Sequence, residues 1–335
     1  MLDPSTRQLS LAIDSVAGAV APWTVDRHAE VDPDVTRRFG ETWRPQWLGD
    51  VRMRLRYLAQ AVAVRRPVIF ADAVTWSAAA FVARDVPLDH LRHSMQCLRD
   101  VLMTELPSAA GDILAPHLDA GLAAVDTPCT ISGETIDPDH PHGRLVLAYL
   151  EAGLSGRAAD AERLLIDAAD RGMPIADLYH DVLTPAQREI GRMWHADEVS
   201  IAEEHLITSL TETVLARLRA YFPDTSPNDR RAVATTVGGE LHAVGMRMIA
   251  DTFLMSGWNV LYLGANVPTH DLLSILVEPA PDLLAISVTN PLHVRELGDL
   301  IAAVRGQPAI TDLPILIGGS VCNRIPDLWT EVGAD

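Results

Sequence analysis

The stretch Ala232–Gly245, AVATTVGGELHAVG, decides the fold of the last third of this chain. Its first six residues form a short apolar run, which predicts a buried strand. Two glycines then permit a tight turn, and a helical pattern starts near Ala243. A strand that turns into a helix in this way is typical of a parallel α/β sheet.

Three further apolar runs follow, and helical stretches separate them. The runs are NVLYLG, DLLAISV and PILIGG, and the helical stretches begin near Thr269 and Leu292. This alternation predicts a Rossmann-like parallel sheet over residues 230–335. Ligands of such sheets bind beyond the carboxyl ends of the strands. The residues that follow each run are therefore the candidates for a binding site.

Three of these loops carry polar or small residues. They are Glu240, His242 and Gly245 after the first run, Ser287 and Thr289 after the third, and Gly318 and Gly319 after the fourth. The dinucleotide fingerprint G-x-G-x-x-G is absent. A histidine in such a loop can bind a metal through one ring nitrogen while a carboxylate holds the other N–H. For the first loop alone, a helix N-terminus with a solvated histidine is the alternative interpretation.

The order E-x-H-x-x-G, S-x-T and G-G resembles the cobalamin-binding domain of B12 proteins. The resemblance implies that His242 is the lower axial ligand of cobalt and that Glu240 is its hydrogen-bond partner. It also implies that Ser287 and Thr289 contact the buried nucleotide tail of the cofactor, for which the two glycines leave room. The chain ends at EVGAD, where such domains usually continue into one more strand and helix.

A second informative stretch is WHADEVSIAEEH, residues 194–205, inside a helical region over 144–221. A capping box at Thr184–Gln187, with Pro185 in the first turn, predicts the start of one helix. ADEV interrupts that helix, and a second capping box at Ser200–Glu203 predicts a new helix from Ile201.

The helix from Ile201 has an apolar stripe and an opposite polar side. The stripe is formed by Leu206, Leu210, Val214 and Leu218, and the opposite side by Ile201, Glu204, His205 and Thr208. A solvated face is the ordinary interpretation of Glu204 and His205. That interpretation does not explain Trp194 and His195 at the end of the preceding helix.

The spacing W-x9-E-H resembles the helix-bundle cap of B12 photoreceptors, including the MerR-type repressors that sense light through adenosylcobalamin. The resemblance implies a four-helix-bundle cap over residues 144–221. Trp194 and Glu204 would shape a pocket for the adenosyl group, and His205 would line it. His195 would become the upper cobalt ligand after light has broken the Co–C bond.

Residues 1–127 are predicted to be helical, and a turn-rich linker over 128–143 follows them. Cys97, Arg99 and Asp100 read C-L-R-D, which is similar to the bilin-attachment stretch of phycobiliproteins, relatives of the globins. That similarity implies a bilin site, for which Trp76, His90 and His93 are further candidates. The two histidines are equally candidates for haem ligands of a globin. A core-building helical domain without a ligand is the third possibility.

The whole layout resembles that of photocobilins, in which a globin-like, bilin-binding region precedes a helical cap and a B12 domain. The resemblance implies a multi-domain α plus α/β photoreceptor, not an enzyme, that binds adenosylcobalamin and biliverdin. Non-covalent binding of biliverdin is favoured over attachment through Cys97. One alternative is a corrinoid methyl carrier of a B12-dependent methyltransferase system. Another is a haem-type globin sensor fused to a B12 module.

Composition narrows the classes of partner. Lys and Arg number 27 and Asp and Glu 45, which gives a net charge of −18. Such an acidic chain, without a recognisable helix-turn-helix, is not expected to bind DNA directly. Cys97, Cys129 and Cys322 lie far apart, which argues against a disulfide framework or a zinc site and suits the cytoplasm. No secretory signal or membrane span is predicted. The expected partners are tetrapyrroles and either a second copy of the chain or a light-dependent protein partner.

Overall fold

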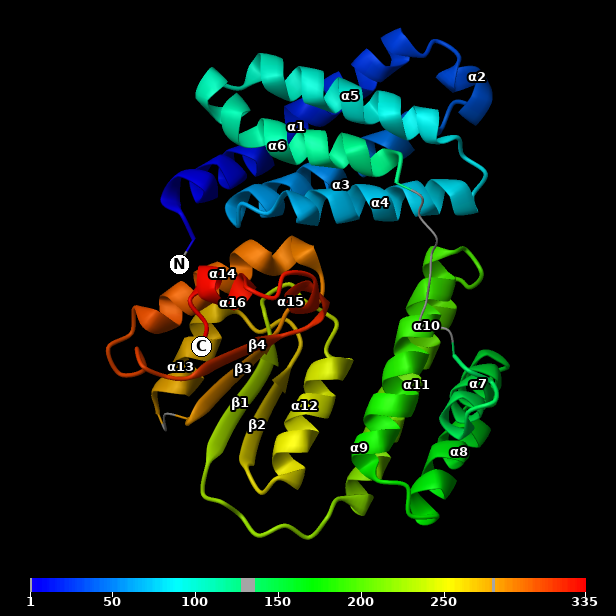
Figure 1. Cartoon of the computed structure of the whole chain (residues 1–335), viewed down its shortest axis with the longest axis vertical. Coiled ribbons are helices and arrows are strands. Elements are labelled where there is room, and N and C mark those ends of the chain that lie inside the picture. The colour runs from blue at the N-terminus through cyan, green and yellow to red at the C-terminus, as the bar shows by residue number, and fades with distance from the viewer. Residues whose placement is uncertain (1, 128–135, 279–280) are drawn as a thin grey trace. The chain divides into compact units, whose positions relative to one another are not determined.

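The computed structural model describes residues 2–127, 136–278 and 281–335 (Figure 1). They form two compact units, and each unit gathers segments that are distant in the sequence. One unit comprises Met1–Thr130, Asn290–Ala302 and Asp327–Gly333; the other comprises Ile131–Thr289, Ala303–Pro326 and Ala334–Asp335. The predicted α plus α/β composition is confirmed.

The four predicted strands form one parallel sheet. Their bounds are β1 Arg231–Thr236, β2 Asn259–Gly264, β3 Leu283–Ser287 and β4 Ile315–Gly318. The strand order is β2-β1-β3-β4, with β1 paired to both β2 and β3. Every residue of β1 after Arg231 is buried, as expected for a central strand that is covered on both faces. The loops after β1 and β3 therefore emerge side by side at the same edge.

Helices alternate with these strands along the chain. They are α12 Val244–Met255, α13 Thr269–Val277, the 3-10 turn η3 Pro291–His293, α14 Val294–Arg305, α15 Ser320–Arg324 and α16 Leu328–Val332. Met246 and Ala250 of α12 pack on Ala234 of β1 and Ala285 of β3. These small residues on the strands let the helix approach the sheet closely.

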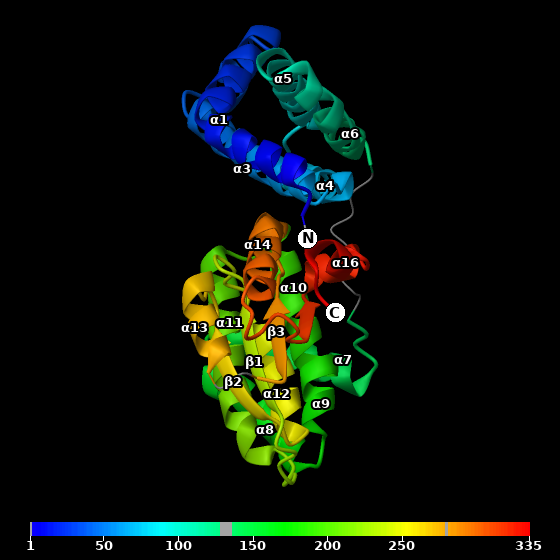
Figure 2. The same ribbon diagram turned by 90° about the vertical axis from the view of Figure 1, so that its left-hand side faces the viewer.

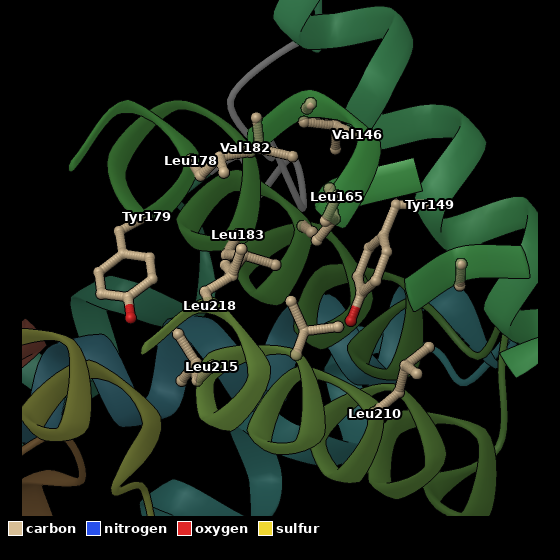
Figure 3. Close-up of a cluster of buried hydrophobic side chains, with 14 of the residues drawn as sticks. Val146, Tyr149, Leu165, Leu178, Tyr179, Val182, Leu183, Leu210, Leu215 and Leu218 are labelled. Carbon is tan, nitrogen blue, oxygen red and sulfur yellow. The ribbon is translucent and has the colours of Figure 1, made fainter. Parts of the chain in front are cut away.

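A helical bundle precedes the sheet within the same unit. It consists of α7 Pro141–Leu154, α8 Ala158–Asp170, α9 Ile175–Asp177, the π-helix η1 Leu178–Leu183, α10 Thr184–His195, α11 Ile201–Leu218 and the 3-10 turn η2 Arg219–Tyr221. Its core is rich in leucine and contains the fully buried Tyr149 (Figure 3). The Tyr149 hydroxyl shares a 2.8 Å hydrogen bond with the hydroxyl of Thr211 on α11.

A buried carboxylate joins this α7–α11 bundle to α12. Asp251 of α12 has no exposed surface. It accepts hydrogen bonds from Tyr179 Oη at 3.1 Å and from Arg219 Nε at 3.0 Å. Figure 1 shows α12 between the strands and α11, so these bonds tie the bundle to the layer that covers the sheet.

The other unit is built mainly from six helices. They are α1 Pro4–Val31, α2 Val35–Phe39, α3 Trp43–Ala63, α4 Pro67–Ala83, α5 Leu88–Glu105 and α6 Ser108–Val125. Helix α1 packs along α3 and α5, and α4 packs against α6 (Figure 2). The predicted helical nature of residues 1–127 is confirmed, and a globin-like arrangement stays a prediction.

The same unit includes the first part of α14. The backbone N–H of Arg295 donates to Gln60 Oε1 at 2.9 Å. Its guanidinium donates to Ser10 Oγ and Asp14 Oδ2, both at 2.7 Å. Arg7 and Asp299 form a second, more exposed ion pair between α1 and α14. Polar contacts thus attach α14 to α1 and α3.

Two further predictions concern connections and membrane spans. Residues 128–135 of the predicted linker lie outside the described residues, and its end belongs to α7, which begins at Pro141. Within the described ranges, none of the helices combines the length and the hydropathy that a membrane span needs.

Candidate functional site

The loop between β1 and α12 presents His242 on a braced backbone. Gly239 has a φ of +84°, which favours glycine. The side chain of Asn266, which follows β2, accepts a 2.7 Å hydrogen bond from the Gly239 N–H. The Thr236 hydroxyl donates to the Glu240 carbonyl at 2.8 Å and accepts from the Asn266 N–H at 3.0 Å. The loop is therefore tied to the ends of two strands.

Glu240 is the buried anchor of this loop. Its side chain is 1 % exposed, whereas that of His242 is 63 % exposed. One carboxylate oxygen accepts from the backbone N–H of His242 at 3.0 Å and lies 2.5 Å from His242 Nδ1. The other oxygen accepts from the Thr289 N–H at 2.9 Å, so the carboxylate links the loops after β1 and β3.

This geometry sets the chemistry of the imidazole. A carboxylate accepts hydrogen bonds, so the Nδ1 of His242 carries a proton and its Nε2 is left to accept or to bind a metal. The hydrogen bond to Glu240 raises the pKa of His242; burial partly opposes this, and the charges of Glu240 and Glu204 add to it. Glu204 belongs to α11, so the field of the α7–α11 bundle acts on this loop.

The other predicted residues of the sheet edge differ in their surroundings. Ser287 is nearly buried at the end of β3. A Cβ atom on Gly319, which has a φ of +105°, would lie 2.2 Å from the Val288 carbonyl oxygen, so the chain's own packing requires glycine there. A Cβ atom on Gly318 or Gly245 would have nothing within 4 Å. These two glycines border open space.

The predicted residues of the bundle gather at the turn between α10 and α11. Trp194 and His195 are the last two residues of α10, and both are half-buried. Glu204 is 23 % exposed at its side chain, and it accepts from Thr208 Oγ1 at 3.0 Å. Its other oxygen lies 2.6 Å from Nδ1 of His205, whose side chain is 72 % exposed. His205 thus holds Glu204 from the solvent side.

The predicted capping box at Ser200–Glu203 is confirmed, because the Ser200 hydroxyl accepts from the Glu203 N–H and the Glu203 carboxylate accepts from the Ser200 N–H. The one at Thr184–Gln187 is wrong. The π-helix Leu178–Leu183 runs straight into α10, and the Thr184 hydroxyl donates to the Tyr179 carbonyl instead. The wider π turn accommodates Pro185, which has no N–H to donate.

The predicted apolar stripe of α11 also needs a correction. Leu206 is 42 % exposed, and Ile207 takes its place as a fully buried residue. A Cβ atom on Gly153 of α7 would lie 2.5 Å from the end of the Ile207 side chain, so the two helices approach closely there. This close approach rotates the buried face of α11 toward Ile207, Leu210, Val214 and Leu218.

The predicted bilin residues do not form one group. His90, His93 and Cys97 of α5 lie on its side toward α1, and burial raises the pKa of the Cys97 thiol. Arg99 forms an ion pair with Asp119 of α6 instead. Asp100 is exposed, and Trp76 of α4 is 47 % exposed.

Sequence reasoning missed three residues that the structure places at sites of interest. Asn266 follows the run NVLYLG, so inspecting the end of that strand as well would have found it. His28 of α1 and Asp32, which directly follows α1, lie beside His93 of α5. Their spacing of four residues at a helix end is too common to have signalled a site.

Comparison with known proteins finds matches for the two segments that carry the predicted residues of the sheet edge and of the bundle. Residues 230–335 and residues 146–219 each match a family model described as a B12 binding domain. The chain is 25 % identical over 224 residues to the HTH-type transcriptional repressor CarH of Myxococcus xanthus, covering 63 % of this chain and 71 % of that protein. It is 27 % identical over 158 residues to the repressor CarA of the same organism, covering 46 % of this chain and about half of that protein, 51 %.

Corrinoid proteins are also similar to this chain. Dimethylamine corrinoid protein 3 of Methanosarcina acetivorans is 20 % identical over 193 residues, which are 55 % of this chain and 89 % of that protein. The structure of the monomethylamine corrinoid protein of Methanosarcina barkeri matches with a TM-score of 0.50 and 18 % identity, covering 57 % of this chain and 91 % of that one. This structural likeness concerns the fold.

The residues at the sheet edge fit a corrinoid. An exposed imidazole whose Nδ1 is bonded to a buried carboxylate offers Nε2 outward as a metal ligand, and Gly245 and Gly318 border open space. Leu241 beside it is 72 % exposed, which suits a loop that a large apolar group covers. The findings support a B12-binding protein whose B12 binding domains are residues 146–219 and 230–335.

Proposed function

We propose that this chain is a light-sensing B12 photoreceptor that binds adenosylcobalamin between the His242 loop and the turn that joins α10 to α11. One observation carries the proposal. An exposed histidine on a buried carboxylate shares a compact unit with Trp194, His195 and Glu204, and the charge of Glu204 acts on His242. The similarity to the repressor CarH, which covers 63 % of this chain, and the two B12 binding domain matches support the proposal.

Each residue of the candidate site has its own role in the proposed binding of adenosylcobalamin. His242 provides an imidazole for the lower face of cobalt, and Glu240 keeps that imidazole oriented. Trp194 provides a large, rigid surface for packing against an adenosyl group, and Glu204 and His205 border the same pocket. Ser287, Thr289 and Gly318 border the space for the nucleotide tail. When bound, adenosylcobalamin supplies a cobalt–carbon bond that visible light breaks.

His195 gives the proposal its signalling step. It ends α10, next to a turn in which Asp197 has a positive φ of 63°. Its imidazole would offer cobalt a nitrogen ligand in place of the adenosyl group. Its movement would alter the turn and hence the packing of α11. A changed α10–α11 turn is the element through which light would act on a second copy of the chain or on a partner protein.

Absorption spectra of the adenosylcobalamin-loaded chain test the proposal. We expect green light to convert the wild-type spectrum to that of a bis-histidine cobalamin. His195→Ala should still bind the cofactor but should end at a different spectrum. His180→Ala is the matched control, because His180 is an exposed histidine of the same bundle, far along the chain from the turn. Identical illuminated spectra for wild type and His195→Ala would exclude His195 from this role.

A corrinoid methyl carrier is the second candidate, and the similarity to dimethylamine corrinoid protein 3 favours it. A carrier needs His242 but no adenosyl pocket. Trp194→Ala separates the two functions. In a sensor this variant should lose affinity for adenosylcobalamin and keep that for methylcobalamin, whereas in a carrier both affinities should change alike.

Biliverdin binding by the helices of residues 1–127 is a further part of the proposal, and it rests on the photocobilin-like layout of the chain and on the C-L-R-D stretch. We expect the chain to take up biliverdin with a red-shifted, sharpened absorption band. Because the Cys97 thiol is buried and its pKa is raised, the bilin should be released on denaturation. Bilin that stays with the denatured chain would indicate a thioether instead.

The output is proposed to be a change of assembly or of partner, without direct contact to DNA. Size-exclusion chromatography of the loaded chain in the dark and after light tests it. A shift in elution that His195→Ala lacks is the expected result, and a shift that persists in this variant would separate assembly from His195.

A further inference from the structure

A cluster of ionisable side chains between α1 and α5 has no place in the B12 site. We call His28, Asp32, His90 and His93 the α1–α5 histidine cluster. His28 and Asp32 lie one turn apart at the end of α1, and His90 and His93 lie one turn apart on α5. The rings of His28 and His93 are 6.3 Å apart, and those of His28 and His90 6.4 Å. All four residues belong to one compact unit.

His28 is the unusual member. It is fully buried, and among the described residues neither of its ring nitrogens has a hydrogen-bond partner. Rings of Trp43 and Trp47 lie about it, with centroids at 6.3 and 6.2 Å. An imidazole in such apolar surroundings ordinarily satisfies at least one nitrogen. His117 of α6, equally buried, does so with the carbonyls of Ile113 and Ala61.

The neighbours of His28 offer further ligand atoms. One atom each of His28, Asp32 and His93 can be chosen so that all three lie within 4.8 Å of one another. Nδ1 of His93 also lacks a partner among the described residues. Ligand atoms around a tetrahedral Zn²⁺ are roughly 3–3.5 Å apart. Small side-chain rotations would close the triad, and Asp32, 17 % exposed at its side chain, leaves a path from solvent.

His90 completes the arrangement from outside the triad. Its Nδ1 lies 3.0 Å from Asp32 Oδ2, and its Nε2 lies 3.2 Å from the guanidinium of Arg38. Arginine only donates, so Nε2 accepts and Nδ1 carries the proton, but this N–H has no hydrogen-bond partner among the described residues. A second group that holds a ligand carboxylate is a common feature of metal sites, and His90 lies close enough to Asp32 for that role.

The charges suit a divalent cation. A metal ion binds the neutral imidazole, so His28 and His93 would each offer one ring nitrogen. Asp32 supplies one negative charge. Arg54, buried nearby, opposes a cation, and Asp50 beside it offsets that charge.

We propose that His28, Asp32 and His93 form a binding site for a divalent first-row transition-metal ion such as Zn²⁺. Two imidazoles and a carboxylate from facing helices match the ligand preferences of these ions and the way in which helical bundles hold them. Because the rings of Trp43 and Trp47 pack around His28, we expect the triad to hold a single ion. The site is separate from the cobalt site, and the proposal does not depend on the function proposed for the B12 domains.

Zinc binding by the cobalamin-free, full-length chain tests the proposal. After removal of metal, the wild type is titrated with Zn²⁺ in competition with a chromophoric chelator. We expect one tight site per chain, weakened by more than about 100-fold in Asp32→Asn and His93→Gln, because removing a ligand costs more than disturbing its surroundings. His117→Gln is the matched control: it changes a buried histidine of the same unit and should keep the tight site. An equal affinity in wild type and both ligand variants would overturn the proposal.

A second measurement avoids variants altogether. In the wild type labelled with ¹⁵N-histidine, stoichiometric Zn²⁺ should shift the ring nitrogens of two of the histidines strongly, and the same two signals should be assigned to His28 and His93. Shifts confined to exposed histidines such as His140 and His205 would overturn the site even if zinc binds.

Discussion

The buried carboxylate of Glu240 braces two loops of the candidate B12 site. It fixes the tautomer of His242 and holds the loop after β3 through the Thr289 N–H. Glu240→Gln keeps the shape but removes the charge. The pKa of His242 should fall, and the imidazole should become a weaker ligand. We expect the affinity for cobalamin to drop by about 10- to 100-fold.

Absorbance titration with cobalamin at fixed pH measures this effect. Glu212→Gln, an exposed glutamate of α11, serves as the control and should bind like wild type. Equal affinities of Glu240→Gln and this control would show that cobalamin binding does not depend on the charge of Glu240.

The buried Tyr149 makes a pH-dependent contribution to stability. Burial raises its pKa to about 12, although the hydrogen bond with Thr211 opposes the shift. In the unfolded chain a tyrosine titrates near pH 10, so between pH 10 and 12 the unfolded chain has lost a proton that the folded chain retains. Stability from this group is therefore full below pH 10 and is lost as the pH rises toward 12, by up to about 3 kcal/mol.

Tyr149→Phe should lack this component. At pH 7 the variant loses one buried hydrogen bond, at a cost of about 1 kcal/mol, and Thr211 still accepts from Gln187. Urea unfolding at pH 7 and at pH 10–11 checks both parts. The difference between wild type and variant should shrink or reverse at the higher pH, and a difference that is constant with pH would contradict the assignment.

At the scale of elements, the α10–α11 turn depends on the capping box at its end. Ser200→Ala removes the acceptor for the Glu203 N–H and should lower the free energy of unfolding by about 1 kcal/mol. Ser209→Ala is a matched control in the middle of the same helix and should change it by less than about 0.5 kcal/mol. Urea denaturation of both variants measures the contrast; equal effects would mean that the cap does not stabilise α11.

The elements that the sequence predicts best are those with a strong local signal. The four apolar runs coincide with β1 to β4. The central strands β1 and β3 are apolar because both of their faces are covered, whereas the edge strands β2 and β4 are apolar although they are partly exposed. The capping box at Ser200 is equally local. The π-helix before Thr184 was not predictable in this way, since it depends on how the bundle packs around Pro185. The exposure of Leu206 follows likewise from the close approach of Gly153 to Ile207.

At the scale of the whole molecule, proximity between distant segments sets the limit of prediction. Glu240 and His242 are two residues apart, so their partnership could be inferred from a motif. His28 and His93 come from different helices, and only the packing of α1 against α5 brings them together. The contacts of α14 with α1 and α3 could not be predicted either, because no local sequence pattern pairs Arg295 with Asp14.

The attachment of α14 gives the last prediction. The side chain of Arg295 is 11 % exposed, and its guanidinium donates to Ser10 and to Asp14. Arg295→Ala leaves both partners in a largely buried place and should lower the free energy of unfolding by about 3 kcal/mol. Arg7→Ala removes the ion pair between Arg7 of α1 and Asp299 of α14. Because the side chains of Arg7 and Asp299 are each 41 % exposed, the free energy of unfolding should fall by less than about 1 kcal/mol. Urea unfolding of Arg295→Ala and Arg7→Ala measures the two changes in the free energy of unfolding. Equal changes would show that burial does not set how strongly these ion pairs attach α14.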